Sequence, residues 1–70
     1  MSDIVKVIEV IAQSTKGFDD AARRAVTEAG KTVHGIKGIW IDNLSGTVEG
    51  NKITEYRVNA KISFVLDEKR

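Results

Sequence analysis

The sequence predicts an α+β domain with the element order β-α-β-β, in which a three-stranded antiparallel sheet wraps on one helix. Three observations predict it: a β-branched segment near the N-terminus, an alanine-rich stripe with helical spacing, and two alternating segments joined by a two-residue loop. Seventy residues suffice for one domain, which we place over residues 1–70.

The first predicted strand covers residues 3–13 (DIVKVIEVIAQ), and its apolar side chains fall on both alternating faces. The two sets are Ile4, Ile8 and Val10 on one side and Val5, Val7 and Ile11 on the other. A single helix covers only one face of a sheet. The second apolar set therefore predicts contact with another subunit.

The helix is predicted from a stripe of apolar residues spaced at three and four positions. These are Phe18, Ala21, Ala22, Ala25, Val26, Ala29 and Val33. We expect the helix to begin near Gly17 or Thr15, with Asp19 and Asp20 in its first turn. We expect Lys31 and His34 near its other end and Gly35 to terminate it.

Two further strands are predicted at residues 36–49 and 52–66, joined by Gly50-Asn51 as a two-residue loop of the glycine-first kind. Pairing Glu49 with Lys52 across this loop sets the register of the hairpin. The resulting pairs are Ile39 with Ile62, Ile41 with Ala60 and Asn43 with Val58. Because these positions are mostly apolar, we expect them to lie beneath the helix.

The same register turns Trp40, Asp42 and Leu44 to the opposite face, which we call the outward face, among Arg57, Asn59 and Lys61. A β-bulge between Ile41 and Gly46 would shift part of this register but leave Trp40 on its face. The only tryptophan is then either a contact with a neighbouring subunit or a stacking platform for a planar ligand.

Composition excludes several classes of protein. Without cysteine the chain has no disulfide, and one histidine, His34, makes a zinc site improbable, so oligomerisation remains as the support for a small core. The longest apolar stretch is interrupted by Lys6 and Glu9, which argues against a membrane span or signal peptide. We expect a cytoplasmic protein. A formal charge of +1 gives no general attraction for nucleic acid or membranes.

No catalytic constellation stands out in the sequence. His34 has no evident orienting partner, Ser14-Thr15 is better explained by helix capping, and the glycines lack the spacing of a phosphate loop. We therefore expect a binding protein and not an enzyme.

Four segments in this order resemble the dodecin family of small flavin-binding proteins. They are VKVIEVIAQST in the first strand, FDDAARRAV in the helix, GIKGIWID in the second strand and EYRVNAKISF in the third. The resemblance covers nearly the whole chain. It implies a hollow homododecamer of β-α-β-β subunits that holds flavins in pairs between subunits, for storage and photoprotective quenching.

The resemblance also assigns roles to three residues. Trp40 would stack on the isoalloxazine ring of FMN or riboflavin, and Asp42 would orient neighbouring residues or the polar ligand edge. The family position that hydrogen-bonds the ring edge carries glutamine after tyrosine, whereas this sequence has Tyr56-Arg57. Arginine donates to flavin carbonyls or pairs with a phosphate, but it accepts no hydrogen bond.

Three alternatives remain open at this point. Some dodecins bind coenzyme A, and a ligand-free structural assembly is compatible with the substitution at Arg57. The third is a binder of single-stranded nucleic acid, with Trp40 stacking a base and Arg57 and Lys61 contacting phosphates. A single aromatic platform and a balanced charge make the third the weakest.

Overall fold

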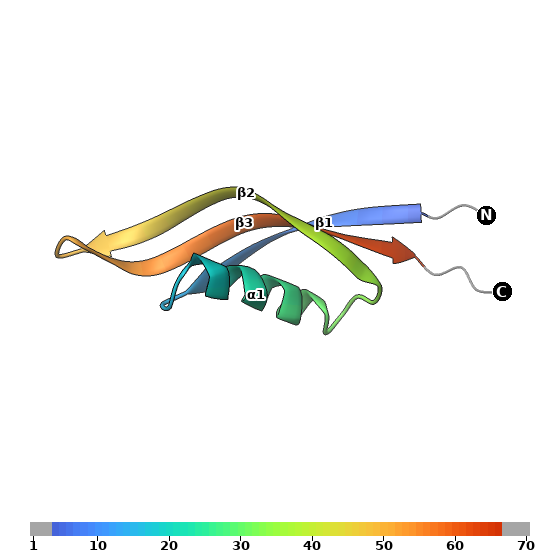
Figure 1. Cartoon of the computed structure of the whole chain (residues 1–70), viewed down its shortest axis with the longest axis horizontal. Helices are drawn as coiled ribbons and strands as arrows, with labels where there is room; N and C mark the ends of the chain where they lie inside the picture. The colour runs from blue at the N-terminus through green and yellow to red at the C-terminus, as the bar shows by residue number, and fades with distance from the viewer. Residues whose placement is uncertain (1–3, 67–70) are drawn as a thin grey trace.

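The computed structural model describes residues 4–66 and confirms the β-α-β-β order. Its elements are β1 (Ile4–Ser14), α1 (Phe18–Ala29), β2 (Ile36–Glu49) and β3 (Lys52–Leu66). All strand pairs are antiparallel and the sheet order is β1-β3-β2, so the last strand of the chain lies in the middle (Figure 1). The residue that opens the first predicted strand, Asp3, lies outside the described residues.

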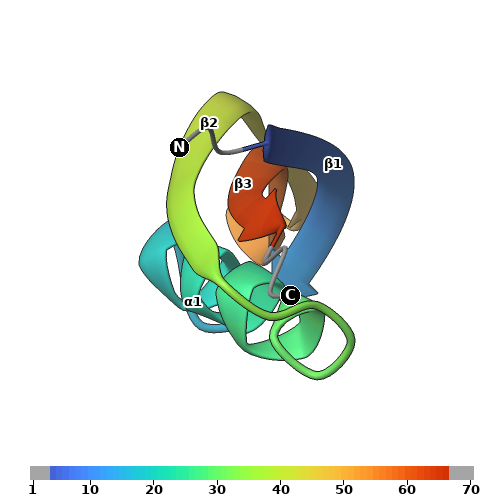
Figure 2. The same ribbon diagram turned by 90° about the vertical axis from the view of Figure 1, so that its right-hand side faces the viewer.

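The core lies between α1 and the sheet and is built from small helical side chains. The buried helix residues are Ala21, Ala25 and Ala29, and they meet Val58, Ala60 and Ile62 of β3. Because alanine extends no further than Cβ, the helix lies close to the strands, which curl over it in the end-on view (Figure 2). Phe18 and Tyr56 close one end of this core, with ring centroids 5.0 Å apart in an edge-to-face arrangement.

The helix begins as predicted but ends earlier. Gly17 is its N-cap residue, whereas the last helical residue is Ala29 and Gly30 follows as the C-cap. The prediction that the helix ends at Gly35 is therefore wrong. Gly35 instead adopts a φ of 76°, and its carbonyl accepts a hydrogen bond from the Val65 amide of β3 at 3.1 Å. Gly35 therefore turns the chain into the sheet, and His34 lies in the exposed loop before it.

The hairpin turn lies at the predicted residues but is of a different type. Gly50 and Asn51 both have positive φ, at 60° and 64°. Positive φ at both central positions is the pattern of a type I′ turn, whereas a glycine-first type II′ turn needs it only at the first. Asparagine tolerates this left-handed conformation better than most residues with a side chain.

An irregularity between Thr47 and Val48 and a β-bulge at Asp42 enclose the part of β2 where the predicted register is incorrect. Ile39 pairs with Ile62 and Ile41 with Ala60, as predicted. From Asn43 to Thr47 the pairing is shifted by one residue, so that Asn43 opposes Asn59 and Leu44 opposes Val58, and the predicted pairing returns at Val48 and Glu49, next to the turn. The expectation that Leu44 lies outward beside Trp40 is therefore wrong: the extra residue turns Leu44 to the helix side.

The hairpin extends well beyond the helix that was expected to cover it. Twelve helical residues span about 18 Å, whereas the fourteen residues of β2 span about 45 Å. Consequently Ile41 and Leu44 point to the helix side of the sheet but remain 41% and 53% exposed. The predicted core thus ends near Ile39, and an elongated hairpin projects from it (Figure 1).

Candidate ligand-binding face

The outward face of the sheet carries Trp40, the residue that the sequence singled out. Trp40 opposes Lys61 on β3, and Lys61 in turn opposes Glu9 on β1. The Trp40 side chain is 49% exposed, since α1 lies on the other side of the sheet. Two positions before it on the same face stands Gly38, opposite Ser63, and Val7 of β1 opposes Ser63 on the other side.

Asp42 is brought close to this row by the bulge. Its Oδ2 atom lies 3.4 Å from Nζ of Lys61, the cross-strand neighbour of Trp40. Both side chains are about one-third exposed, at 33% for Asp42 and 38% for Lys61. The indole therefore has a carboxylate and an ammonium group beside it, which together accept and donate hydrogen bonds. Lys61 and Asp42 together form the polar part of the surface beside Trp40. The sequence prediction did not include Lys61 among the site residues.

Arg57 shares the outward face but is not a neighbour of Trp40 in the subunit. Four residues of β3 separate Arg57 from Lys61, a distance of about 13 Å along the strand. Its guanidinium group donates from Nε and Nη2 to Oε1 of Gln13, which opposes it on β1. Sequence reasoning missed Gln13, because no hairpin turn joins β1 to β3 and fixes their register.

Apolar side chains occupy much of the outward face of β1. Val5, Val7 and Ile11 are 57%, 46% and 62% exposed, as the two-sided pattern of this strand predicted. Ile11 lies in the row between those of Trp40 and Arg57, opposite Asn59. The candidate face is therefore an apolar surface interrupted by a few polar groups, which is the usual composition of an interface or of a pocket for an aromatic ligand.

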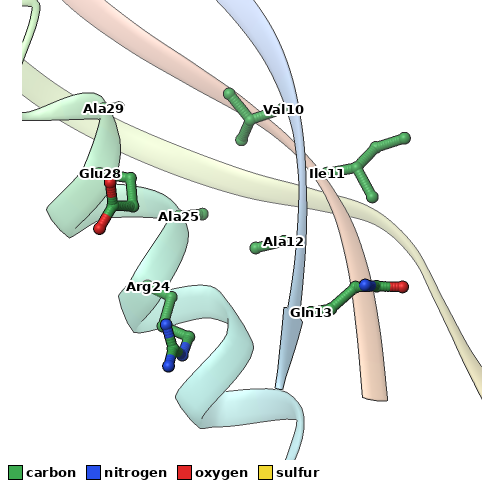
Figure 3. A pocket seen from close by; sticks show the side chains of 8 residues that line it. All are labelled: Val10, Ile11, Ala12, Gln13, Arg24, Ala25, Glu28 and Ala29. Atoms are coloured by element: carbon green, nitrogen blue, oxygen red, sulfur yellow. The ribbon is translucent and has the colours of Figure 1, made fainter. Parts of the chain in front are cut away.

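A groove of about 320 Å³ on the other side of the sheet, between β1 and α1, is a weaker candidate. Val10 and Ala12 face Ala25 and Ala29 across it, and Ile11 and Gln13 point away from the helix (Figure 3). None of the predicted site residues lines this groove.

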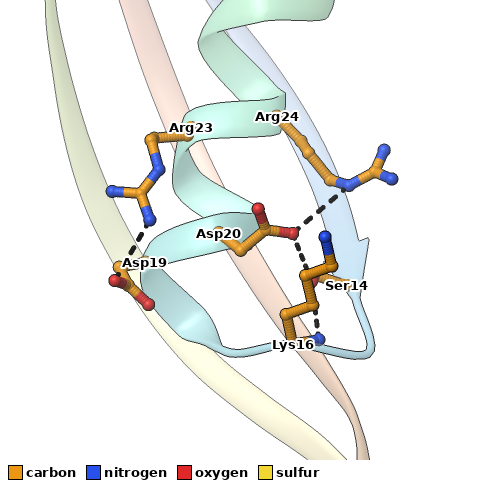
Figure 4. Close-up of polar contacts among 6 residues, drawn as sticks. All are labelled: Ser14, Lys16, Asp19, Asp20, Arg23 and Arg24. Carbon is orange, nitrogen blue, oxygen red and sulfur yellow. Dashed lines mark hydrogen bonds and ion pairs between the residues drawn. The ribbon is translucent and has the colours of Figure 1, made fainter.

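The polar contacts at the start of α1 serve the fold. Ser14 is buried, donates to Oδ2 of Asp20 and accepts a hydrogen bond from the Lys16 amide at 2.9 Å (Figure 4). The hydrogen bond from Ser14 is the largest cause that lowers the pKa of Asp20, assisted by the positive charges of Lys16, Arg24 and Arg23. Ser14 thus ties the end of β1 to the first turn of the helix.

Residues 4–66 contain neither a metal-binding cluster nor a membrane-spanning helix. No cluster of three or more histidine, cysteine, aspartate or glutamate side chains there has the arrangement of a metal site. The helix of this part of the chain is too short and too polar to cross a membrane.

Comparison with known proteins agrees with this fold. The family model described as dodecin matches residues 4–67. The chain belongs to the dodecin family. A dodecin of Thermus thermophilus is 26% identical over 68 residues, which cover 97% of this chain and 99% of that protein.

Solved dodecin structures share the whole fold. Dodecin from Streptomyces coelicolor is 30% identical and superimposes with a TM-score of 0.89, with 96% of each chain covered. Dodecin from Streptomyces davaonensis is 25% identical and has a TM-score of 0.91. The match covers 97% of this chain and 100% of that chain. Calcium dodecin from Mycobacterium tuberculosis, described as having a calcium-binding site, is 28% identical with a TM-score of 0.78 over 96% of each chain.

Proposed function

We propose that this dodecin binds flavin without catalysing a reaction, and that it stores and sequesters the ligand at the outward face around Trp40. The observation that carries the proposal is the half-exposed indole on a sheet face that the helix does not cover. An uncovered tryptophan of this kind suits an aromatic ring system that stacks on it.

The groups around Trp40 fit the chemistry of an isoalloxazine ring. The ring is planar and apolar over its faces, whereas its edge carries carbonyl oxygens and an N–H group. Lys61 can donate to the carbonyl oxygens, and Asp42 can accept from the N–H group. Stacking against indole shields the ring from water and reactants, and a close indole quenches the excited flavin by electron transfer. This geometry supports storage and photoprotection as the role of the bound flavin.

The site is completed by assembly into a homododecamer. One subunit supplies one face for stacking and leaves the other face of the ring in water, whereas a second subunit with its own Trp40 covers both. The exposed Val5, Val7 and Ile11 on the same face give the subunits an apolar surface through which to meet. Membership of the dodecin family supports this arrangement.

A fluorescence titration of riboflavin and FMN with the protein tests the proposal. We expect micromolar protein to quench the fluorescence of at least one flavin, and Trp40→Ala to abolish most of the quenching. Arg23→Gln is the matched control, because Arg23 lies on the exposed side of α1, away from the outward face. Equal quenching by the Trp40→Ala protein would refute the assignment of the site.

A ligand-free structural assembly is the second candidate. The observation that favours it is the separation of Arg57 from Trp40. Arg57 occupies the position that hydrogen-bonds the ring edge in the family, but here its guanidinium group is hydrogen-bonded to Gln13. A purified oligomer that binds neither riboflavin, FMN nor coenzyme A would support this candidate over flavin storage. Binding of coenzyme A alone would identify it as the ligand in place of flavin.

A further inference from the structure

We infer that residues 43–47 of β2 form a register switch, a segment that pairs with β3 in either of two registers one residue apart. The structure shows the first register, with an irregularity at each end of the segment. In the second register both irregularities are absent, and the segment presents its other side chains on the outward face. The inference goes beyond the proposed function, and its test needs no flavin.

The irregularities on either side of this segment compensate each other. Immediately beyond both of them, β2 pairs with β3 in the same register. Between them each strand contributes six residues, 42–47 on β2 and 54–59 on β3. Only five pairs form there, and they leave out Asp42 on one strand and Thr54 on the other. Sliding the segment by one residue would pair all six positions and restore an unbroken ladder, while the rest of the hairpin stays in place.

Burial does not decide between the two registers. A strand is held firmly in register where one of its faces is buried, but every residue of β2 from Trp40 to Glu49 is exposed. In the observed register Leu44 lies on the helix side and is 53% exposed, because the helix does not reach it. In the second register Leu44 turns to the outward face and Asn43 takes its place on the open helix side. The exchange therefore changes little buried apolar area.

Two surface contacts offset the cost of the irregularities, each of which interrupts the backbone ladder. At one end, Oδ2 of Asp42 lies 3.4 Å from Nζ of Lys61. At the other, Oγ1 of Thr54 donates to the carbonyl of Thr47 at 3.3 Å. Contacts of this kind contribute modestly where water reaches them. The two registers are therefore close in free energy.

Gly46 permits the observed register. A Cβ atom at this position would lie 3.0 Å from the carbonyl oxygen of Glu55 and 3.2 Å from Cγ2 of Ile53. The first of these neighbours is backbone and cannot rotate away. In the second register position 46 lies on the outward face of a regular ladder, which accommodates a side chain. A side chain at position 46 should therefore shift the equilibrium towards the second register.

The switch changes what the hairpin presents on its two faces. In the observed register the outward face of the segment carries polar side chains, which are Asn43, Ser45 and Thr47. In the second register it carries Asp42, Leu44 and Gly46. An apolar partner on the outward face favours the second register, because it covers Leu44, whereas a partner on the helix side favours the first. The register of β2 thus responds to which face is covered.

Disulfide trapping tests the switch, because the chain has no cysteine of its own. The double variant Ser45→Cys/Arg57→Cys places two thiols opposite each other in the observed register. In that register Leu44 and Arg57 lie on opposite faces of the sheet, so Leu44→Cys/Arg57→Cys closes only in the second. We expect both disulfides to form in the folded, assembled protein under mild oxidation. Non-reducing electrophoresis distinguishes a disulfide within the chain from one between subunits.

The control pair has the same offset but lies outside the segment. Ile41 and Asn59 lie on opposite faces in both registers, so Ile41→Cys/Asn59→Cys should not close. Adding Gly46→Ala to the two trapping pairs should speed closure of the second-register pair and slow closure of the first, each about fivefold.

Leucine methyl NMR gives a measurement without cysteines. Leu44 and Leu66 are the only leucines, so selective labelling isolates the switch segment from nearly all other signals. We expect relaxation dispersion at Leu44 in the wild type. Thr54→Val, which keeps the shape of the side chain but removes its contact with Thr47, should raise the population of the second state about threefold.

Two results would overturn the inference. One is a folded Leu44→Cys/Arg57→Cys protein that closes no faster than the control pair. The other is a single, exchange-free Leu44 signal that neither Thr54→Val nor Gly46→Ala changes. Either result would make the irregularities fixed features of the strand and leave flavin binding untouched. A failure to bind flavin, in turn, would leave the switch intact.

Discussion

At the scale of single residues, Ser14 is the polar side chain that contributes most clearly to the fold. It is 7% exposed and makes two hydrogen bonds at once, to the Asp20 carboxylate and from the Lys16 amide. We expect Ser14→Ala to lower the free energy of unfolding by about 1–2 kcal/mol at neutral pH, since one lost partner is charged. Thr15→Ala is the matched control, because Thr15 is exposed. Urea denaturation measures both.

The loss of stability caused by Ser14→Ala should depend on pH. The pKa of Asp20 in the folded chain is lowered from its ordinary 3.8, so its ionised form stabilises the fold. That contribution is complete above the unfolded value and disappears as the pH falls through the lower, folded value. The difference between wild type and Ser14→Ala should therefore shrink below pH 3.8. A difference that stays constant into strong acid would contradict the role given to the Ser14–Asp20 hydrogen bond.

At the scale of elements, the contact between α1 and the sheet depends on alanine. Ala25 is 4% exposed and lies in one cluster with Ile62 of β3. A larger side chain there must separate the helix from the strand, so we expect Ala25→Leu to destabilise the protein by about 1–3 kcal/mol. Thr27→Leu, on the exposed side of α1, should change stability little. An equally stable Ala25→Leu protein in thermal or urea unfolding would show that this contact is looser than the structure indicates.

The sequence predicted those elements well wherever a local pattern decides them. Alternation located β3, and the two-residue loop fixed the register at Glu49 and Val48. The predicted pairing of Ile41 also holds, because the bulge at Asp42 reverses the shift that begins at Thr47. The bulge at Asp42 could be suspected but not placed, because the ladder as a whole decides which residue is left unpaired. The end of the helix was wrong because Gly35 is needed by the sheet, which helical periodicity does not show.

In the candidate site, the face of Trp40 was predictable from the sequence, whereas the side-chain partners of Asp42 and Arg57 were not. Trp40 lies on the predicted face because the bulge at Asp42 reverses the register shift that begins at Thr47. Asp42 lies beside Lys61, and not merely on the same face, because the bulge redirects it. The partnership of Arg57 with Gln13 depends on how β1 pairs with β3 across the helical connection, and no turn residue encodes that pairing.

At the scale of the whole molecule, the described chain is an elongated body of 56 × 19 × 13 Å with apolar side chains on both sides of its sheet. The helix covers part of one side only. On the other, Trp40 and the exposed residues of β1 form a surface that a lone subunit would leave in water. Assembly would cover these side chains and, under the proposed function, would form a binding site from the same residues.

The central claim is that Trp40 binds flavin only in the assembled protein. Sedimentation velocity, recorded at the flavin absorption band, tests it most directly. We predict that flavin sediments with a particle many times heavier than the 7.7 kDa chain, and that Trp40→Ala assembles but leaves flavin behind. Ile11→Lys, which places a charge on the apolar surface, should weaken assembly and flavin binding together. Flavin that sediments with a single 7.7 kDa chain, or with assembled Trp40→Ala, would contradict the claim.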